Sequence, residues 1–245
     1  MAEWWPFVDV EMRRRLGELG DHRELTLAWD APIEAATDLT GVVAIVRFGG
    51  AFSSETLESA PNLQALGVNT DNSGHGLPLE RLWSRGVTVI DTTRAWAQSV
   101  AELGLALAIS GLRQIPHWHG RMAAGEPLFT FEYAQYCDDD RFVNGDLGTK
   151  DVGIIGLGQI GGRVARFCHA LGSTVRAYDP YVAAEGAQSS GATLVDLDEL
   201  IVDSEVVFVT VPPAPSARHL LDRRRIGMLR RGSLVVIVTR AFAVD

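Results

Sequence analysis

Three glycines spaced as Gly-x-Gly-x-x-Gly form the pattern with the clearest chemistry in this sequence. Gly156, Gly158 and Gly161 directly follow the apolar run Val152–Ile155 and directly precede an amphipathic stretch. Glycines so spaced permit a tight turn out of a strand, close approach of a diphosphate to the backbone, and close packing of a helix on the sheet. The free N–H groups of the helix's first turn then face the phosphates. The pattern therefore predicts a diphosphate site, although a glycine turn without this context often binds nothing.

An acidic residue, Asp179, stands where such a site needs one. It follows a second apolar run, Thr174–Tyr178, and lies 18 positions after Gly161. A carboxylate there accepts hydrogen bonds from the ribose 2′ and 3′ hydroxyls of a dinucleotide. It also repels a 2′-phosphate, and Pro180–Val182 supplies no cation to bind one, while Arg176 is expected to point away. These residues predict dinucleotide binding, with NAD favoured over NADP.

The bulk properties fit a globular protein and argue against several classes of partner. Of the 245 residues, 47% are hydrophobic and 22% are charged, and the net charge of −9 disfavours nucleic acid or an anionic membrane. The two cysteines cannot form a disulfide framework, and the run Asp138–Asp140 has no partners at a metal-binding spacing. The N-terminus has no signal-peptide pattern, and the apolar segment Leu103–Leu112 is too short to span a bilayer. We expect a cytoplasmic protein without a metal site.

Apolar runs alternate with amphipathic stretches, which predicts two α/β domains with parallel sheets. Strands are predicted at Leu25–Trp29, Val42–Val46, Leu63–Val68, Val87–Ile90, Val152–Ile155, Thr174–Tyr178, Val206–Val211 and Ser233–Thr239. Helices are predicted at Ser54–Ser59, Leu79–Arg85, Gln159–Leu171, Leu197–Val202 and Arg223–Leu229. Between the two sets, Ala95–Gly111 is apolar on nearly all sides and continues as Leu112–Met122 with a more polar face. Such a helix is either buried in its own domain or forms an interface.

Four stretches together resemble the D-isomer-specific 2-hydroxyacid dehydrogenase family. They are Gly156–Gly161 with Asp179 and Pro180, Val100–Glu102, Val209–Pro212 with Pro215 and Ser216, and Gly232–Arg240. The resemblance implies two Rossmann-like or flavodoxin-like domains: a substrate domain over residues 1–96 and an NAD-binding Rossmann domain over residues 97–245. It implies hydride transfer between NAD(H) and a D-specific 2-hydroxy or 2-keto acid, as in glyoxylate and hydroxypyruvate reductases or phosphoglycerate dehydrogenase. A homodimer through Ala95–Gly111 is also implied.

The resemblance assigns roles to individual residues. Arg240 is the implied catalytic residue, since a bidentate cation at the carboxyl end of a strand can hold a substrate carboxylate and polarise the keto oxygen. A surface residue at a strand end would look the same without the motif. The implied substrate-binding residues are Asn72, Ser73 and Gly74. The implied cofactor-binding residues are Thr92, Gly156, Gly158, Gln159, Ile160, Gly161, Asp179, Val211, Pro212, Val238 and Thr239. The sequence departs from the family pattern at Thr93, usually proline, and at Ala241, commonly glycine.

A general acid/base is the part of the family's chemistry that the sequence does not supply. The family uses a histidine paired with a carboxylate downstream of the arginine, whereas this chain ends at Asp245. None of the six histidines fits the role well, and His75 is the one to test. We therefore expect a cofactor domain that is incomplete at its C-terminal end, with little or no dehydrogenase turnover by the 245-residue chain.

Three hypotheses about function remain open. The first is an NAD-dependent 2-hydroxyacid dehydrogenase. The second is an NAD-binding, non-catalytic, dimerising regulatory protein of the same fold, as in the related C-terminal binding protein corepressors. The third is another Rossmann enzyme, such as a formate or phosphonate oxidoreductase.

Overall fold

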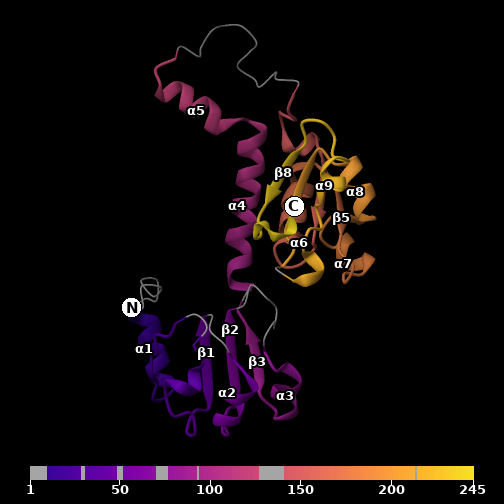
Figure 1. The fold of residues 1–245 in the computed structure, drawn as a ribbon. Helices are drawn as coiled ribbons and strands as arrows, with labels where there is room; N and C mark the ends of the chain where they lie inside the picture. Colours follow the sequence, from indigo (N-terminus) through magenta and orange to yellow (C-terminus); the bar gives the residue numbers. More distant parts are fainter. Residues whose placement is uncertain are drawn as a thin grey trace. The chain divides into compact units, whose positions relative to one another are not determined.

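A computed structural model of the chain describes residues 10–28, 31–48, 52–69, 77–92, 94–126, 141–212 and 214–245. The chain divides into two compact units, and among the described residues the first unit ends at Thr92 and the second begins at Arg94 (Figure 1). The boundary predicted between residues 96 and 97 lies inside helix α4 (Arg94–Leu112). Because this helix is continuous and packs on α6 (Gly161–Leu171) and β8 (Leu234–Ile237), it belongs wholly to the second unit.

The first unit is a small parallel α/β fold. Its elements are α1 (Val10–Leu19), η1 (Ile33–Ala35), β1 (Ala44–Phe48), α2 (Ser54–Ser59), β2 (Ala65–Asn69), α3 (Leu79–Ser84) and β3 (Thr88–Asp91). The strands pair in parallel in the order β1-β2-β3. Helix α2 begins with a capping box in which the Ser53 hydroxyl accepts from the Thr56 N–H and the Thr56 hydroxyl accepts from the Ser53 N–H.

The two faces of this sheet differ. Leu66 and Val68 lie on the buried face, packed with Leu57 and Leu82. On the other face, Val46 and Ile90 are 66% and 52% exposed, and they flank Gly67 in one row across the three strands. The alternation of side chains along each strand accounts for this division.

The second unit is a doubly wound parallel sheet. Its elements are α4, α5 (Ile115–Ala123), η3 (Leu147–Thr149), β4 (Asp151–Ile155), α6 (Gly161–Leu171), β5 (Thr174–Tyr178), α7 (Ala184–Gln188), β6 (Thr193–Leu194), α8 (Leu197–Asp203), β7 (Val206–Val209), η4 (Pro215–Ala217), α9 (Arg223–Ile226), β8 (Leu234–Ile237) and η5 (Ala241–Ala243). The strand order is β6-β5-β4-β7-β8, all parallel. Buried residues of α4 and α6 share one core cluster, and those of α8 belong to another. The predicted α/β class with parallel sheets is confirmed.

Helix α4 is longer than its apolar sequence run suggested. It has 19 residues and is long and apolar enough, by length and composition alone, to cross a membrane. Its buried residues fall on one stripe and are small except for the last, namely Ala97, Ala101, Gly104, Ala108 and Leu112. This stripe packs on α6 and β8, which makes α4 a core helix of the second unit.

Two predicted elements differ from the structure, and three elements of the structure were not predicted. Residues 25–28 of the strand predicted at Leu25–Trp29 form no strand, since an apolar pattern without a neighbouring strand supplies no backbone hydrogen bonds. The helix predicted through Leu112–Met122 is interrupted at Gln114, whose φ of 49° lies in the left-handed region. Helices α1 and α7 and strand β6 were not predicted at all.

Candidate functional site

The glycine turn leaves the sheet at the carboxyl end of its central strand, β4. Gly156 has a φ of +93°, and its N–H donates to the Tyr178 carbonyl of the neighbouring strand over 2.8 Å. A Cβ on Gly156 would lie 2.9 Å from Cγ1 of Val211, whose side chain is buried beneath the turn. Both the backbone conformation and the space therefore require glycine here.

The two later glycines have opposite surroundings. A Cβ on Gly161 would lie 2.0 Å from the Gly156 carbonyl oxygen, so the first residue of α6 sits directly against the turn. A Cβ on Gly158 would meet no atom within 4 Å, and Gly158 is exposed. Gly161 is thus needed by the turn itself, whereas the absence of a side chain at Gly158 leaves open space above the backbone. That space fits a diphosphate at the start of α6.

Asp179 bridges the two loops at this edge of the sheet. Its Oδ2 accepts from the Leu157 N–H over 2.8 Å, and its Oδ1 accepts from the Tyr181 N–H over 2.9 Å. Each carboxylate oxygen has a further lone pair for a ligand hydroxyl. Arg176 points away, as predicted, because its guanidinium binds the Asp151 carboxylate at the start of β4, with 3.0 Å between Nη1 and Oδ1.

A shallow depression of about 590 Å³ adjoins Asp179. Its lining residues are Tyr178, Asp179, Pro180, Leu194, Val195, Asp196 and Glu199. Three of these side chains are carboxylates and none is a cation. Its volume suits a nucleoside, and its charge favours a ribose hydroxyl over a ribose phosphate.

The remaining sequence-predicted residues of the second unit lie on the same edge or at its margin. The Thr239 hydroxyl donates to the Val211 carbonyl over 2.6 Å, and the Val238 N–H donates to the Val209 carbonyl over 3.1 Å, which joins the loops after β7 and β8. Pro212 is exposed beside them.

Gln159 and Ile160 complete the glycine turn, and Arg240 follows β8. The Ile160 carbonyl accepts from the Arg163 and Val164 N–H groups at the start of α6, and Gln159 is exposed. Arg240 is exposed immediately before η5. Its position at the carboxyl end of β8 is where open α/β sheets bind ligands.

Among the other predicted site residues, Thr92 is the last described residue of the first unit. Thr92 donates twice to the Val68 carbonyl, from its N–H over 2.8 Å and from its hydroxyl over 2.9 Å. Asn72, Ser73, Gly74 and His75 lie outside the described residues.

Two residues of potential functional importance were missed in the sequence. Thr210 is buried directly after β7, and its hydroxyl donates to the Gly156 carbonyl. Arg47 lies on β1, beside Val68 and in one row with Asp91 at the carboxyl ends of the first sheet. Among the residues that the structure describes, Arg47 Nε and Nη1 are buried without a hydrogen-bond partner, and burial lowers the pKa of this guanidinium. The sequence signal that could have identified Arg47 is a charged residue within an otherwise apolar strand.

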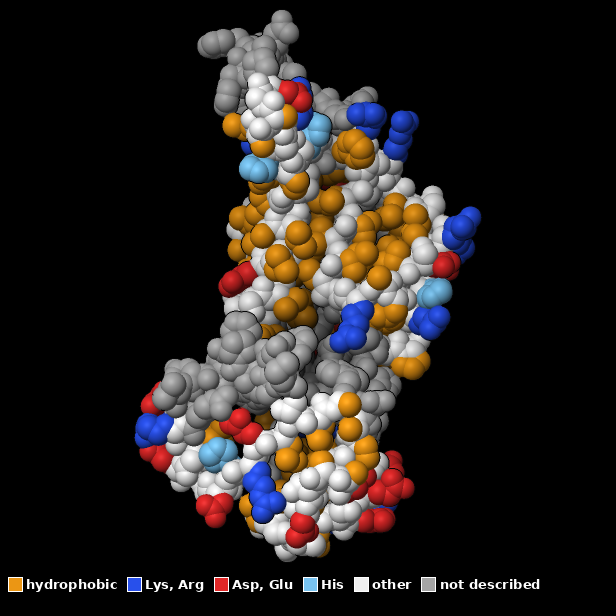
Figure 2. Space-filling view, turned by 60° about the vertical axis from the view of Figure 1, so that its left-hand side comes forward, with side chains coloured by type: hydrophobic (Ala, Val, Ile, Leu, Met, Phe, Trp, Pro, Cys, Tyr) orange, Lys and Arg blue, Asp and Glu red, His pale blue; other side chains and the backbone are white. Residues whose placement is uncertain are grey.

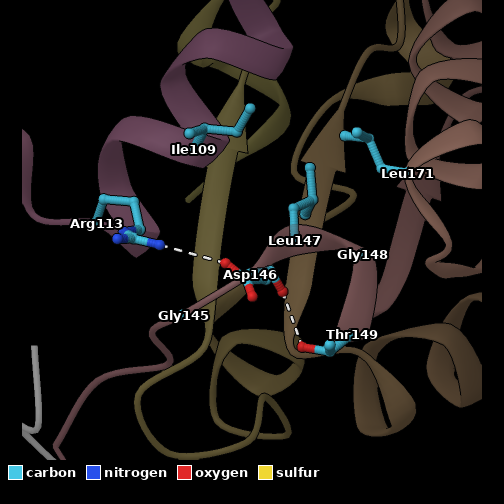
Figure 3. Close-up of a pocket in the computed structure, with 8 residues that line it drawn as sticks. All are labelled: Ile109, Arg113, Gly145, Asp146, Leu147, Gly148, Thr149 and Leu171. Atoms are coloured by element: carbon cyan, nitrogen blue, oxygen red, sulfur yellow. Dashed lines mark hydrogen bonds and ion pairs between the residues drawn. The ribbon is translucent and has the colours of Figure 1, made fainter. Parts of the chain in front are cut away.

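A second pocket, of about 540 Å³, lies at the opposite edge of the second sheet (Figure 3). It is bordered by the end of α4, by η3 and by Leu171 at the end of α6. Arg113 reaches across its rim to Asp146, with 3.2 Å between Nη1 and Oδ1. Because β4 and β5 begin here, this pocket is separate from the glycine turn at their far ends.

Neither metal ligands nor a buried histidine–carboxylate pair is found in the described part of the chain. No group of three or more His, Cys, Asp or Glu residues there could hold a metal ion. The His219 Nδ1 lies 3.7 Å from Asp245 Oδ1, and both side chains are exposed.

Comparison with known proteins agrees with this geometry. Residues 105–245 match the family model described as D-isomer specific 2-hydroxyacid dehydrogenase, NAD binding domain. The chain is 30% identical over 227 residues to a D-3-phosphoglycerate dehydrogenase of Methanocaldococcus jannaschii, covering 87% of this chain and 41% of that protein. It is 28% identical over 206 residues to a hydroxypyruvate reductase of Thermotoga maritima, covering 83% and 62%. The chain thus spans about two fifths of the length of the first relative and under two thirds of the second.

Solved structures show the same fold. A D-lactate dehydrogenase from Aquifex aeolicus, complexed with NAD and lactic acid, superposes with a TM-score of 0.68 at 22% identity, over 98% of this chain and 68% of that chain. An acyclic imino acid reductase in complex with NADPH and D-Arg gives a TM-score of 0.72 at 20% identity, over 98% and 73%.

Proposed function

The chain belongs to the D-isomer-specific 2-hydroxyacid dehydrogenase family, and we propose on this basis that it transfers a hydride between NAD(H) and a 2-hydroxy or 2-keto acid. The resemblance drawn from four sequence stretches is confirmed, and so is the prediction of an NAD-binding domain. The observation that carries the proposal is the turn at Gly156–Gly161, with open space at Gly158 and the Asp179 carboxylate beside it.

Different residues at the glycine turn would bind different parts of the cofactor. The backbone at Gly158 and the first turn of α6 hold the diphosphate, and the Asp179 carboxylate accepts from the hydroxyls of the adenosine ribose. Bound NAD supplies the hydride acceptor, and NADH the donor. The acidic depression beside Asp179 supports NAD over NADP.

Arg240 is the proposed anchor for the substrate. Its guanidinium offers two parallel donors to a carboxylate. Because Arg240 stands at the carboxyl end of β8, it lies on the edge of the second sheet that also carries the glycine turn. Replacing Arg240 with lysine should raise the substrate KM and lower kcat while leaving the NADH dissociation constant unchanged.

The Arg47 guanidinium of the first unit favours an anionic ligand. A desolvated cation whose Nε and Nη1 have no partner among the described residues is costly unless a ligand supplies one. A phosphate or distal carboxylate would supply two charge-assisted hydrogen bonds. A phosphorylated 2-hydroxy acid fits this better than lactate or glyoxylate, and the similarity to D-3-phosphoglycerate dehydrogenases supports it.

Homodimerisation through α4 is the proposed assembly. Leu103 and Leu107 are one helical turn apart on its outer side and are 56% and 45% exposed, and Figure 2 shows hydrophobic side chains gathered along this helix. Such a patch on a soluble protein marks an interface. Replacing both leucines with aspartate should convert a dimer to a monomer in sedimentation analysis, whereas Leu19→Asp, at an exposed position on α1, should not.

The other proposed properties follow from charge and family. A net charge of −9 disfavours nucleic acid and an anionic membrane as partners, and the family favours a small 2-hydroxy or 2-keto acid as the substrate. A cytoplasmic location is part of the same proposal. A non-catalytic, NAD-binding dimer of the same fold is the second candidate, and the exposed stripe of α4 favours it equally.

Titration with NADH, followed by its fluorescence, tests the cofactor site. The protein should bind NADH saturably, and Asp179→Ala should weaken binding about 10- to 100-fold because hydrogen bonds to a charged group are lost. Glu185→Gln is the matched control, since it removes an exposed carboxylate of α7 in the same unit. Absence of saturable NADH binding would contradict the proposal.

Turnover separates the two candidates. The protein as its gene encodes it should oxidise NADH with a 2-keto acid if it is a dehydrogenase. NADH binding without turnover on phosphohydroxypyruvate, hydroxypyruvate, glyoxylate or pyruvate would favour the non-catalytic dimer instead.

A further inference from the structure

One peptide group of the glycine turn is held from both ends. The carbonyl oxygen of Gly156 accepts from the Thr210 hydroxyl over 2.6 Å, and the N–H of Leu157, in the same peptide plane, donates to Asp179 Oδ2 over 2.8 Å. The two bonds point in opposite directions, as the carbonyl and N–H of a trans peptide must. The direction of this peptide therefore couples Thr210 to Asp179.

Thr210 is itself fixed by the sheet. It is 8% exposed, and its own N–H donates to the Ile155 carbonyl over 2.9 Å at the end of β4. Its hydroxyl lies 3.2 Å from the Ile155 oxygen and 2.6 Å from the Gly156 oxygen, so Gly156 receives the better hydrogen bond. A threonine is also stiff about χ1 because it is β-branched.

The hydrogen bond from the Thr210 hydroxyl stabilises the orientation of the Gly156 carbonyl. Gly156 is buried, and the start of α6 is crowded against the same oxygen, as the 2.0 Å approach of a Cβ on Gly161 indicates. A buried carbonyl without a donor is costly, and glycine readily rotates its peptide to another direction. Rotation would carry the Leu157 N–H away from the Asp179 carboxylate.

We propose that Thr210 is a positioning residue that sets the direction of the Gly156–Leu157 peptide and thereby aims the Asp179 carboxylate at the ribose. This rests on the proposed NAD site. Thr210 then governs the preference for NADH over NADPH, because only a correctly placed carboxylate both accepts from a 2′ hydroxyl and repels a 2′-phosphate. The Tyr181 N–H holds the other carboxylate oxygen independently, so loss of Thr210 weakens this preference without abolishing it.

The test compares Thr210→Val with Thr210→Ser by titrating each purified protein with NADH and with NADPH. Valine keeps the shape and removes the donor, so NADH binding should weaken about tenfold while NADPH binding changes little. Serine keeps the donor and should restore most of the preference. Ser173→Ala is the matched control, because it removes a buried hydroxyl that donates to the Leu147 carbonyl over 2.8 Å at the far edge of the sheet.

The outcomes distinguish the inference from the function on which it rests. If the unmodified protein binds neither nucleotide, the proposed function fails. If it binds NADH but Thr210→Val leaves the NADH-to-NADPH ratio of dissociation constants unchanged, or lowers both affinities equally as a general loss of stability would, the inference about Thr210 is overturned alone. The same holds if Thr210→Ser behaves as Thr210→Val does. Thermal unfolding of each variant verifies that it is folded.

Discussion

The two sheets of the molecule differ in how the polar side chains near their carboxyl ends are hydrogen-bonded. In the second unit, β4 and β7 are buried along most of their length, and the ligand edge is braced by hydrogen bonds from Thr210, Asp179 and Thr239 to the backbone. In the first unit, one face of the sheet is exposed at Val46 and Ile90, and a desolvated guanidinium lies on the other. On the proposed function, the second unit would recognise the cofactor by backbone shape, whereas the first unit would recognise the substrate by the charge of Arg47.

The largest expected effect comes from crowding the braced turn. Gly161→Ala should destabilise the protein by about 3 kcal/mol and abolish NADH binding, because its Cβ would overlap the Gly156 carbonyl. Gly158→Ala meets open space and should leave the unfolding temperature unchanged while weakening NADH binding. Thermal unfolding and NADH titration measure both. Normal NADH binding by Gly161→Ala would show that the glycine turn can rearrange to accommodate a Cβ. The carboxyl edge of the second sheet would then be less rigid than its hydrogen bonds suggest.

The buried thiol of Cys168 provides a way to measure how readily the core of the second unit opens to solvent. Burial raises the pKa of this thiol to about 12 from its ordinary 9.0. The unfolded chain therefore loses this proton at lower pH than the native one, and stability falls as pH rises from 9 towards 12, by about 1.4 kcal/mol at pH 10. Cys168→Ala should remove this part of the pH dependence. Rapid alkylation of native Cys168 at pH 8 would show instead that the unit opens readily.

Replacing Arg47 tests whether its charge in the first unit serves the substrate or the fold. Arg47→Met should raise the free energy of unfolding by about 1 kcal/mol and lower kcat/KM for a phosphorylated 2-keto acid more than for pyruvate. Arg81→Met is the control, since Arg81 forms an exposed ion pair with Glu58, and its loss should change stability by less than about 0.5 kcal/mol. A destabilised Arg47→Met with unaltered substrate preference would assign Arg47 to the fold alone.

The smallest effect is expected at the surface of the second unit. Arg225 and then Arg224 lower the pKa of Asp198 through hydrogen bonds to its carboxylate. The stabilisation is present above the ordinary pKa of an aspartate and is lost as the pH falls through the lowered value. Asp198→Asn should lower the unfolding temperature slightly at pH 6, and the difference from the unmodified protein should shrink as the pH falls below the ordinary pKa of an aspartate. A large change at pH 6 would mean that surface pairs contribute more here than the buried edge of the sheet.

The cofactor turn was predictable because it is local in the sequence. Strand, glycines, helix, strand and Asp179 follow one another, and the structure places β4, α6 and β5 within two residues of the predicted bounds. Thr210 was not predictable as a partner of Gly156, because 54 residues separate them and only the pairing of β4 with β7 brings them together. The burial of Arg47 was hidden for a similar reason, since it depends on which face of β1 packs inward.

Two glycines of α4 bring the backbone of this helix close to the segment that leads to Arg240. A Cβ on Gly104 would lie 3.0 Å from Cγ1 of Val238, and one on Gly111 would lie 2.9 Å from Cδ2 of Leu234, so α4 rests almost backbone-first on the segment that leads to Arg240. Because only the side chains of Val238 and Leu234 separate the helix backbone from this segment, we expect a displacement of α4 to shift the residues that precede Arg240. If the proposed dimer forms, we expect the apparent substrate KM, unlike the NADH dissociation constant, to vary with protein concentration across the range of dimerisation.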